Sequence, residues 1–371
     1  MKIEADWMRG GTSKCWVFVT ANLAETGTSP DVLLPRLFGS PDHRQIDGVG
    51  GATSTTSKAM ILNRPVDDDI DVEFTFAQVG IEEAAVDWGS NCGNCSAVVG
   101  LYAIEKGWVV PTGDVTKIVT RNTNTGQIII QRVDTPSGAL PITPQANMPG
   151  VPFPGYQVGL GFQDPEGKTT GKLLPTGSAT DTVDANGTTW RVSMVDAGAP
   201  VVILRATDFG LDPEDHGGWS RQVEPHLATL DVIRREAAVR MGLAATPAEA
   251  ARAIPKVALV AGPADTDMES DASVMMLSMG KPHPALAITG SIALTLAART
   301  EGTVLHELTG AVPAVLRLRT PAGMIETWSE QQGGSLLVGV DRTARTIANT
   351  TIHLPETLDN NVGASLAGAT R

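Results

Sequence analysis

Two segments of this chain are apolar on nearly every side, and they constrain the fold more than any other feature. Residues 96–106 (SAVVGLYAIEK) and 284–300 (PALAITGSIALTLAART) consist mostly of small and apolar side chains. A helix that is apolar all round has no face suited to water, so it is buried. One such helix lies in each half of the chain, which predicts two similar units, each built around a central helix.

The segments around these two helices read as strands. Residues 70–76 (IDVEFTF) alternate apolar and polar side chains, as a half-buried strand does. The 39 glycines and 24 prolines agree with a chain that reverses direction often. Hairpins are predicted where residues 117–120 meet 128–130 and where 314–319 meet 324–328, and further strands at 190–195, 201–204, 257–260 and 335–340.

These elements predict an α+β fold with two similar domains. Each domain is expected to be a mixed, mostly antiparallel curved sheet or barrel wrapped around its buried helix. The boundary is placed near residue 185, giving an N-terminal domain of residues 1–185 and a C-terminal domain of residues 186–371. The end of the C-terminal domain can pack back on the first domain. A third helix, predicted over residues 225–241, is amphipathic and expected on the outside, with Gly242 as its stop signal.

The charge and the cysteines narrow the class of protein. A net charge of −13 argues against nucleic acid or a membrane surface as partner, because both demand clustered cations. An acidic small molecule is not excluded, since a binding site needs only local positive charge. Three cysteines do not make a disulfide framework, and the N-terminus has no apolar signal region. We therefore expect a cytoplasmic protein.

The first stretch that could form a functional site is Arg9-Gly10-Gly11-Thr12-Ser13-Lys14. Two glycines beside hydroxyl groups and cations suit an anion cradle made of backbone N–H groups and short donors. Thr12, Ser13 and Lys14 are therefore candidate substrate-binding residues. An ordinary turn is an equally good explanation of this stretch taken alone.

The second stretch, residues 50–58, is a run of small and hydroxylated residues that ends in Ser57 and Lys58. Apolar residues 59–62 follow directly. A lysine at the start of an apolar strand loses hydration, which lowers its pKa and makes it a usable base. A lysine that extends from a strand edge into water is the alternative.

The third stretch, Asn91-Cys92-Gly93-Asn94, directly precedes the first buried helix. A cysteine there meets the positive end of the helix dipole, which stabilises its thiolate, and the free N–H groups can hold a carboxylate. An inert buried cysteine is one alternative, and a redox or zinc pair with Cys95 is another. A zinc site lacks a second cysteine pair, so no metal is predicted.

A similar polar entry precedes the second buried helix. Lys281 and His283, with Thr289 and Gly290 in the helix itself, would supply a second helix N-terminus facing the first. A lone histidine is more often structural than catalytic. The chain carries no G-x-S-x-G and no H-E-x-x-H, and no G-x-G-x-x-G follows a convincing parallel strand, so hydrolase and dehydrogenase functions lack support.

Taken together, these stretches resemble the PrpF family, the 2-methylaconitate cis-trans isomerases and their allylic-isomerase relatives, which have a diaminopimelate-epimerase-like fold. The resemblance is carried in order by residues 8–14, 39–42, 45–48, 50–58, 86–94, 174–177, 240–242, 278–281 and 342–345. It implies that Lys58 and Cys92 lie at an active site between the two domains. It also implies a reaction without a cofactor, and it is compatible with a homodimer.

The chain departs from the usual family pattern at two cysteines. Cys15 stands where glycine is typical, and Cys95 stands where an apolar residue is common. Epimerases of this fold commonly use one cysteine from each half as paired bases. The second half of this chain has no cysteine, so a racemase with two thiols is disfavoured and Lys58 fits as the base.

The predicted function is isomerisation of a small unsaturated di- or tricarboxylic acid. Lys58 would remove an allylic proton, and Cys92 would return it or support the resulting anion. Backbone N–H groups of Gly93 and Asn94, with the hydroxyl groups of Thr12, Ser13 and Ser57, would stabilise the developing charge. Cis-trans isomerisation and a 1,3-shift remain open as outcomes. The alternatives are a 4-oxalomesaconate tautomerase of aromatic degradation, a non-catalytic carboxylate-binding protein, and a redox or zinc protein.

Overall fold

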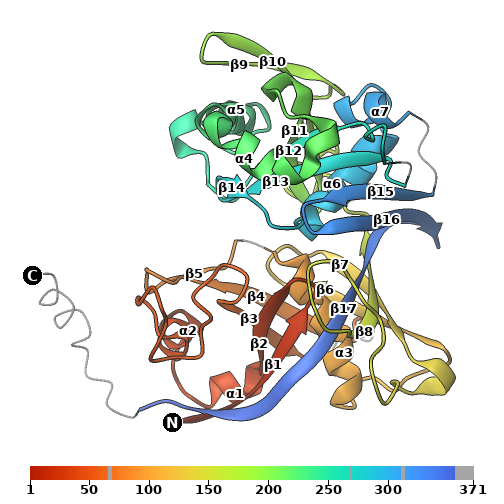
Figure 1. Ribbon diagram of the computed structural model, residues 1–371. Coiled ribbons are helices and arrows are strands. Elements are labelled where there is room, and N and C mark those ends of the chain that lie inside the picture. The colour runs from red at the N-terminus through yellow and green to blue at the C-terminus, as the bar shows by residue number, and fades with distance from the viewer. Residues whose placement is uncertain (66–68, 90, 268, 311–313, 356–371) are drawn as a thin grey trace, which may run out of the picture.

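The computed structural model describes residues 1–65, 69–89, 91–267, 269–310 and 314–355, and the chain forms two lobes (Figure 1). The strands are β1 Lys2–Gly10, β2 Ser13–Val19, β3 Lys58–Asn63, β4 Val72–Val79, β5 Val86–Asp87, β6 Val115–Asn122, β7 Ile128–Asp134, β8 Tyr156–Gln163, β9 Asp181–Ala185, β10 Thr188–Ala197, β11 Ala199–Arg205, β12 Lys256–Ala261, β13 Ala272–Ser278, β14 Lys281–Pro282, β15 Val315–Thr320, β16 Gly323–Gln332 and β17 Ser335–His353. The α-helices are α1 Thr20–Ala24, α2 Pro30–Phe38, α3 Gly93–Glu105, α4 Trp219–Gln222, α5 Leu227–Arg240, α6 Ile288–Arg299 and α7 Val304–Thr309.

The first lobe is a closed barrel around α3. Its strands follow the order β1, β2, β3, β4, β6, β7, β8 and β17, and β17 pairs back with β1. Most neighbours are antiparallel; the β2–β3 and β4–β6 pairs are parallel. The buried residues of α3 run continuously from Gly93 to Ile104, so this helix is surrounded on all sides, as its composition predicts.

The second lobe repeats this order around α6. Strands β10, β11, β12, β13, β15, β16 and the start of β17 succeed one another, and the β11–β12 and β13–β15 pairs are parallel. β17 pairs with β8, and a bridge between Glu166, just beyond β8, and Ala197 of β10 connects this side of the sheet to β10, the first strand of the lobe. Each parallel pair therefore has a counterpart at the same place in the other lobe.

The pair β8–β17 belongs to both lobes. The first part of β17 pairs with β16 in the second lobe, and its later part pairs with β1 in the first. Figure 1 shows β17 passing from one lobe to the other as a long blue strand. One hydrophobic cluster accordingly includes residues of both α3 and α6, which makes the two lobes one packed body around their junction.

The predicted elements are confirmed, with shifts of a few residues at their ends. The amphipathic helix over 225–241 is α5, and Gly242 follows it in the left-handed conformation with φ +72. Both predicted hairpins are present as β6–β7 and β15–β16. The strand expected at 70–76 is displaced to Val72–Val79.

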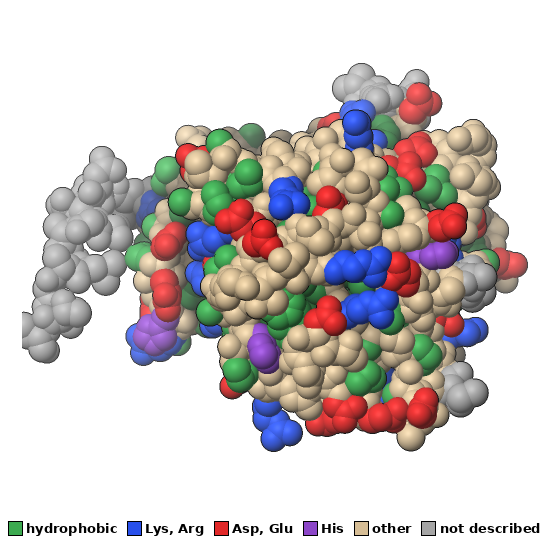
Figure 2. All heavy atoms as spheres, turned by 90° about the horizontal axis from the view of Figure 1, so that it is seen from above, with side chains coloured by type: hydrophobic (Ala, Val, Ile, Leu, Met, Phe, Trp, Pro, Cys, Tyr) green, Lys and Arg blue, Asp and Glu red, His purple; other side chains and the backbone are tan. Residues whose placement is uncertain are grey.

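The predicted boundary near residue 185 falls in the turn of a hairpin, because β9 ends at Ala185 and pairs with β10. The division into domains at this point stays a prediction. In the described part of the chain, no helix has the length and apolar character needed to cross a membrane. On the face of the molecule in Figure 2, acidic and basic side chains are interspersed and apolar areas are small.

Candidate active site

The N-termini of the two central helices meet where the lobes join. A Cβ atom added to Gly93, the first residue of α3, would lie 2.5 Å from Cβ of Ile288, the first residue of α6. The first N–H groups of a helix have no acceptor within the helix, and the dipole makes this end positive. Two such ends from different lobes therefore form one place suited to an anion with more than one carboxylate.

Lys58 lies at this junction as the first residue of β3. Its side chain is only 8% exposed. The ammonium group donates a hydrogen bond of 2.6 Å to Oε1 of Gln78 and lies 4.9 Å from the ring centre of Phe76. Both contacts stabilise a positive charge. The charge of Lys58 also acts on Cys92, whose pKa it lowers, so the structure brings the two predicted catalytic residues together.

Cys92 is the N-cap of α3, as expected, and its Sγ accepts from the backbone N–H of Cys95 at 3.5 Å. The expectation of a stabilised thiolate is wrong. A hydrogen bond with the Cys95 thiol, followed by burial, raises the pKa of Cys92 well above its usual value, and the opposing effect of Lys58 is smaller. Burial removes the water that would solvate a thiolate. Cys92 therefore stands in the site as a neutral thiol.

The other two cysteines lie beside Cys92 in the core. Cys95 forms thiol hydrogen bonds with both Cys92 and Cys15, and burial raises its pKa well above the usual value. Cys15 lies in β2 and is fully buried. The two departures from the family pattern, Cys15 and Cys95, thus form one packed contact between β2 and α3 that extends to the thiol of Cys92.

The glycine-rich loop between β1 and β2 packs on the start of α3. Asn94 donates a hydrogen bond of 3.2 Å from Nδ2 to Oγ1 of Thr12. A Cβ atom on Gly11, whose φ is +51, would lie 2.0 Å from Oδ1 of Asn94. Thr12 and Asn94 are therefore brought together at the junction. Ser13 shares the strand face of Cys15, which points towards α3, because side chains alternate along a strand.

Three other predicted residues are less directly placed for binding. The ammonium group of Lys14 lies 4.3 Å from the ring centre of Trp7, on the opposite strand face from Cys15. Ser57 donates its hydroxyl hydrogen to the carbonyl of Val79 at 3.0 Å, so this hydroxyl group supports the loop. Asn91 is half-buried next to Cys92, and its buried Oδ1 atom has no hydrogen-bond partner among the described residues.

From the second lobe, His283 faces the same junction. Its Nδ1 accepts from the backbone N–H of Ala285 at 3.0 Å. Burial and then the charge of Lys256 lower the pKa of His283 to about 4, with a smaller effect of Lys58. The ring is therefore neutral at neutral pH, and its remaining proton is on Nε2, which makes it a hydrogen-bond donor.

Of the three remaining predicted residues in the second lobe, two lie at the start of α6 and one is exposed in β14. Thr289 and Gly290 are buried in the first turn of α6. A Cβ atom on Gly290 would lie 2.4 Å from Sδ of Met276, so a larger residue there would require the end of this methionine side chain to shift. Lys281 is exposed in β14, and the structure does not bring it into this group.

Sequence reasoning missed Lys256. It is the first residue of β12, and its Cδ lies 3.7 Å from the place a Cβ of Gly290 would take. Burial and then the charge of Lys58 lower the pKa of Lys256, and Cys92 acts in the opposite direction. The signal was present, because Lys256 precedes apolar residues 257–261 as Lys58 precedes 59–62.

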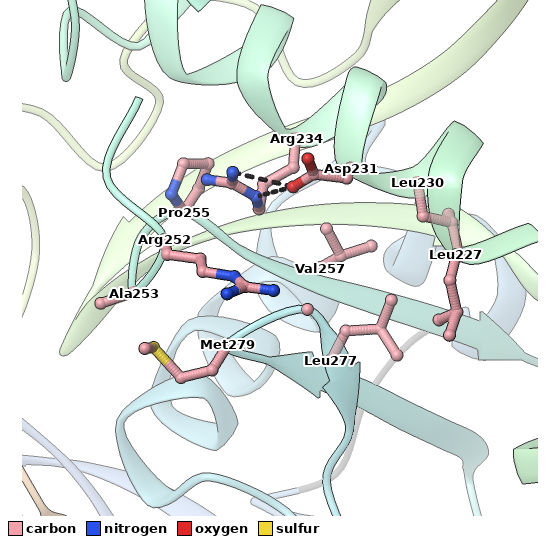
Figure 3. A pocket seen from close by; sticks show the side chains of 11 residues that line it. Leu227, Leu230, Asp231, Arg234, Arg252, Ala253, Pro255, Val257, Leu277 and Met279 are labelled. Atoms are coloured by element: carbon pink, nitrogen blue, oxygen red, sulfur yellow. Dashed lines mark hydrogen bonds and ion pairs between the residues drawn. The ribbon is translucent and has the colours of Figure 1, made fainter. Parts of the chain in front are cut away.

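Three of the hollows formed by the described residues lie elsewhere on the molecule. One, between α5 and β12, holds about 10 Å³, which is room for about one water molecule; Figure 3 shows Arg234 paired with Asp231 at its wall. The second, of about 570 Å³, is lined in part by Glu214, Asp267 and Glu269. The third, of about 520 Å³, includes Asp114 and Asp134 in its lining. In the two larger hollows carboxylates outnumber cations, although Arg319 also lines the second, and this balance disfavours an acidic ligand there.

Comparisons with known proteins agree over nearly the whole chain. The family profile described as PrpF protein matches residues 1–355. The chain is 33% identical to 2-methyl-aconitate isomerase of Shewanella oneidensis, with 96% of this chain and 98% of that protein covered. It is 34% identical to 3-methylitaconate isomerase of Eubacterium barkeri (94% and 96% covered) and 34% identical to 4-oxalomesaconate tautomerase of Pseudomonas putida (91% and 92%).

Solved structures give the same result for the fold. The crystal structure of methylitaconate-delta-isomerase matches with a TM-score of 0.81 and 32% identity, covering 95% of both chains. A probable proline racemase from Agrobacterium radiobacter matches with a TM-score of 0.57 at 12% identity, which bears on the fold alone. The predicted α+β, epimerase-like fold is confirmed.

Fold and relatives together define the class of this protein: it is an isomerase. Among isomerases, the chain belongs to the PrpF family, as its match to the family over residues 1–355 shows.

Proposed function

We propose that this enzyme isomerises a small unsaturated di- or tricarboxylic acid of the 2-methylaconitate or aconitate type, without a cofactor, by removing and returning a proton. The observation that carries the proposal is the meeting of Lys58 and Cys92 at the facing N-termini of α3 and α6. Relatives named for methylaconitate and methylitaconate support the choice of substrate class.

Substrate carboxylates would bind at the two helix N-termini, next to the backbone N–H groups of Gly93, Asn94 and Thr289. Lys58 would exchange a proton with an allylic carbon. Removal of that proton leaves an anion delocalised over the double bond and its carboxylate. The neutral thiol of Cys92 and Nε2–H of His283 are donors that can face this charge.

The position of proton return would decide the product. Return at the far carbon gives a 1,3-shift, and rotation in the anion followed by return at the same carbon gives cis-trans isomerisation. A tautomerase acting on 4-oxalomesaconate uses the same two steps, and one relative carries that name. This reaction is the alternative function.

The test is proton NMR in D₂O with purified protein. The panel contains cis- and trans-aconitate, 2-methylaconitate, methylitaconate and 4-oxalomesaconate. Deuterium uptake with formation of a new isomer is expected for at least one acid. Lys58→Ala is expected to lower kcat by about 10²–10⁴-fold, as the loss of a general acid–base residue does. Lys117→Ala, at an exposed strand lysine, serves as the matched control.

Two results would count against the proposal. Folded protein that leaves the whole panel unchanged and undeuterated would favour a carboxylate-binding role. A Lys58→Ala enzyme as active as the Lys117→Ala control would show that Lys58 does not take part in the proton transfer.

We also propose a homodimer in the cytoplasm and a division into domains at residue 185. Light scattering after size-exclusion chromatography tests the dimer, and a monomer at micromolar concentration would contradict it. Cell fractionation tests the location, and limited proteolysis tests whether cleavage near residue 185 releases two folded parts.

A further inference from the structure

Lys58 and Lys256 occupy equivalent positions in the two lobes. Each is the first residue of a strand that runs parallel to the strand before it in the barrel and antiparallel to the strand after it. Each strand is followed, after one further strand and a two-residue strand, by the central helix of its lobe. Through this repeat, each lobe contributes one lysine at the start of the corresponding strand.

The side chain of Lys256 is directed to that junction by packing. Its Cδ lies against the first turn of α6, 3.7 Å from the Cβ position of Gly290. Its ammonium nitrogen has a contact of 3.5 Å with the carbonyl of Ala253, which is at the outer limit of a hydrogen bond. Lys58, in contrast, has a short bond of 2.6 Å to Gln78 and the ring of Phe76.

The surroundings of Lys256 lower its pKa. The charged and titratable groups that act on Lys256 are Lys58 from β3 and Cys92 at the start of α3. The charge of Lys256 in turn lowers the pKa of His283, which follows β14. Burial and the positive charge of Lys58 lower the pKa of Lys256. Both effects disfavour the charged form of Lys256, which makes this side chain suited to accept a proton, while the ammonium group of Lys58 donates to Gln78.

We propose that Lys256 is a second proton-transfer residue of the isomerase, which works with Lys58 from the opposite lobe. The inference rests on the proposed function. In one direction, the Lys256 amine takes a proton from one carbon of the allylic unit, and the electron pair of the broken C–H bond enters the delocalised anion. The Lys58 ammonium then gives its proton to the receiving carbon, where a new C–H bond forms. Proton exchange with water restores both lysines, and the reverse reaction uses them in the opposite roles.

A different role for Lys256 would be to hold a substrate carboxylate by charge alone. Lys256→Arg separates the two roles, because arginine keeps the positive charge and does not act as a base at neutral pH. We expect Lys256→Arg to keep KM within about threefold of the wild-type value and to lose about 10²–10⁴-fold in kcat. Lys117→Arg, at an exposed lysine of β6, is the matched control.

Chemical rescue adds a measurement that a structural role would not affect. Lys256→Ala should regain activity when methylamine or ethylamine is added, with a rate that depends on the basicity of the amine. Failure of these amines to restore any activity, or a Lys256→Arg enzyme with kcat within about threefold of wild type, overturns the proposal.

The wild-type enzyme gives an independent test that does not depend on the folding of a variant. In D₂O, transfer by two residues places solvent deuterium on the receiving carbon from the first turnover. Appearance there of the proton removed from the substrate means that one residue does both steps, which overturns the inference about Lys256. A wild-type enzyme that neither isomerises nor deuterates any of the acids is a different result, because it contradicts the proposed function itself.

Discussion

Gly93 of α3 and Ile288 of α6 touch so closely that a Cβ atom on the glycine would lie 2.5 Å from Cβ and 2.6 Å from Cγ2 of the isoleucine. These are the first residues of the two central helices, one from each lobe. The N–H groups expected to hold the substrate therefore lie at the contact that fixes the spacing of the lobes. The absence of a side chain at residue 93 sets how closely the two helix ends approach each other.

Gly93→Ala is expected to push the helix ends apart and damage the site. Overpacking of this kind costs about 1–3 kcal/mol of unfolding free energy, and we expect kcat/KM to fall at least about tenfold. Urea denaturation and steady-state kinetics measure the two effects. Gly217→Ala is the control, because a Cβ atom there meets nothing within 4 Å. Equal effects of the two substitutions would show that the close contact at Gly93 is unimportant.

Gly11→Ala is expected to displace Asn94 from the glycine-rich loop. Gly11 has φ +51, and a Cβ atom would lie 2.0 Å from Oδ1 of Asn94. Gly126→Ala shares the positive φ, +70, but meets no atom within 4 Å. The control should therefore show only the backbone cost of about 1–2 kcal/mol, and Gly11→Ala should cost more and also raise KM. An unchanged KM in Gly11→Ala would show that the glycine-rich loop does not contribute to substrate binding.

His283 is expected to make the folding free energy depend on pH. Its pKa is about 4 in the folded protein against 6.5 for a free histidine. Since the unfolded chain binds the proton more readily between these values, stability is fully present above about pH 6.5 and is lost as the pH falls towards 4. The loss is at most about 3 kcal/mol.

Urea titrations at several pH values compare wild type with His283→Gln and with His43→Gln, the control at an exposed histidine. The His283 variant should lose part of the acid dependence, and the His43 variant should retain it. Identical pH profiles for all three proteins would rule out a buried neutral His283.

Cys92 is expected to react slowly with iodoacetamide at pH 7. The thiolate is the reactive form, and the Cys95 hydrogen bond and burial raise the pKa of Cys92. We expect a rate at least about tenfold below that of free cysteine, rising as the pH is raised, because each pKa unit reduces the thiolate fraction tenfold.

Peptide mapping by mass spectrometry resolves Cys92 from Cys15 and Cys95. Lys58→Gln should slow the reaction further, since the charge of Lys58 lowers the pKa of Cys92. Rapid modification at pH 7 with little pH dependence would mean that the helix dipole outweighs burial after all.

Much of the fold followed from local pattern. The two buried helices were predictable because their residues offer no polar face, and α3 and α6 are buried along nearly their whole length. Hairpins such as β6–β7 were predictable because their turn residues lie between apolar strands. The ends of β4 were displaced because strand ends depend on pairing partners that are distant in the sequence.

The site depends on packing that local pattern does not express. Lys58 and Cys92 were identified from the residues around them together with a family resemblance. Lys256 followed the same local pattern, but only the repeat of the barrel order reveals that it is the counterpart of Lys58. The thiolate expected at Cys92 was wrong, since the dipole of α3 is a local property and the Cys95 contact and burial belong to the packed core.

The sequence by itself determined which segments must be buried, where the chain turns, and which polar residues stand at the starts of the two central helices. These are properties of neighbours along the chain, and hydrophobic patterning and backbone preferences express them directly. Only the tertiary structure decided that the two helix starts meet, that two lysines from different lobes lie near one junction, and in which direction burial shifts the pKa of Cys92, Lys256 and His283. Proximity between residues nearly two hundred positions apart, and the desolvation that changes a pKa, exist only once the chain has packed.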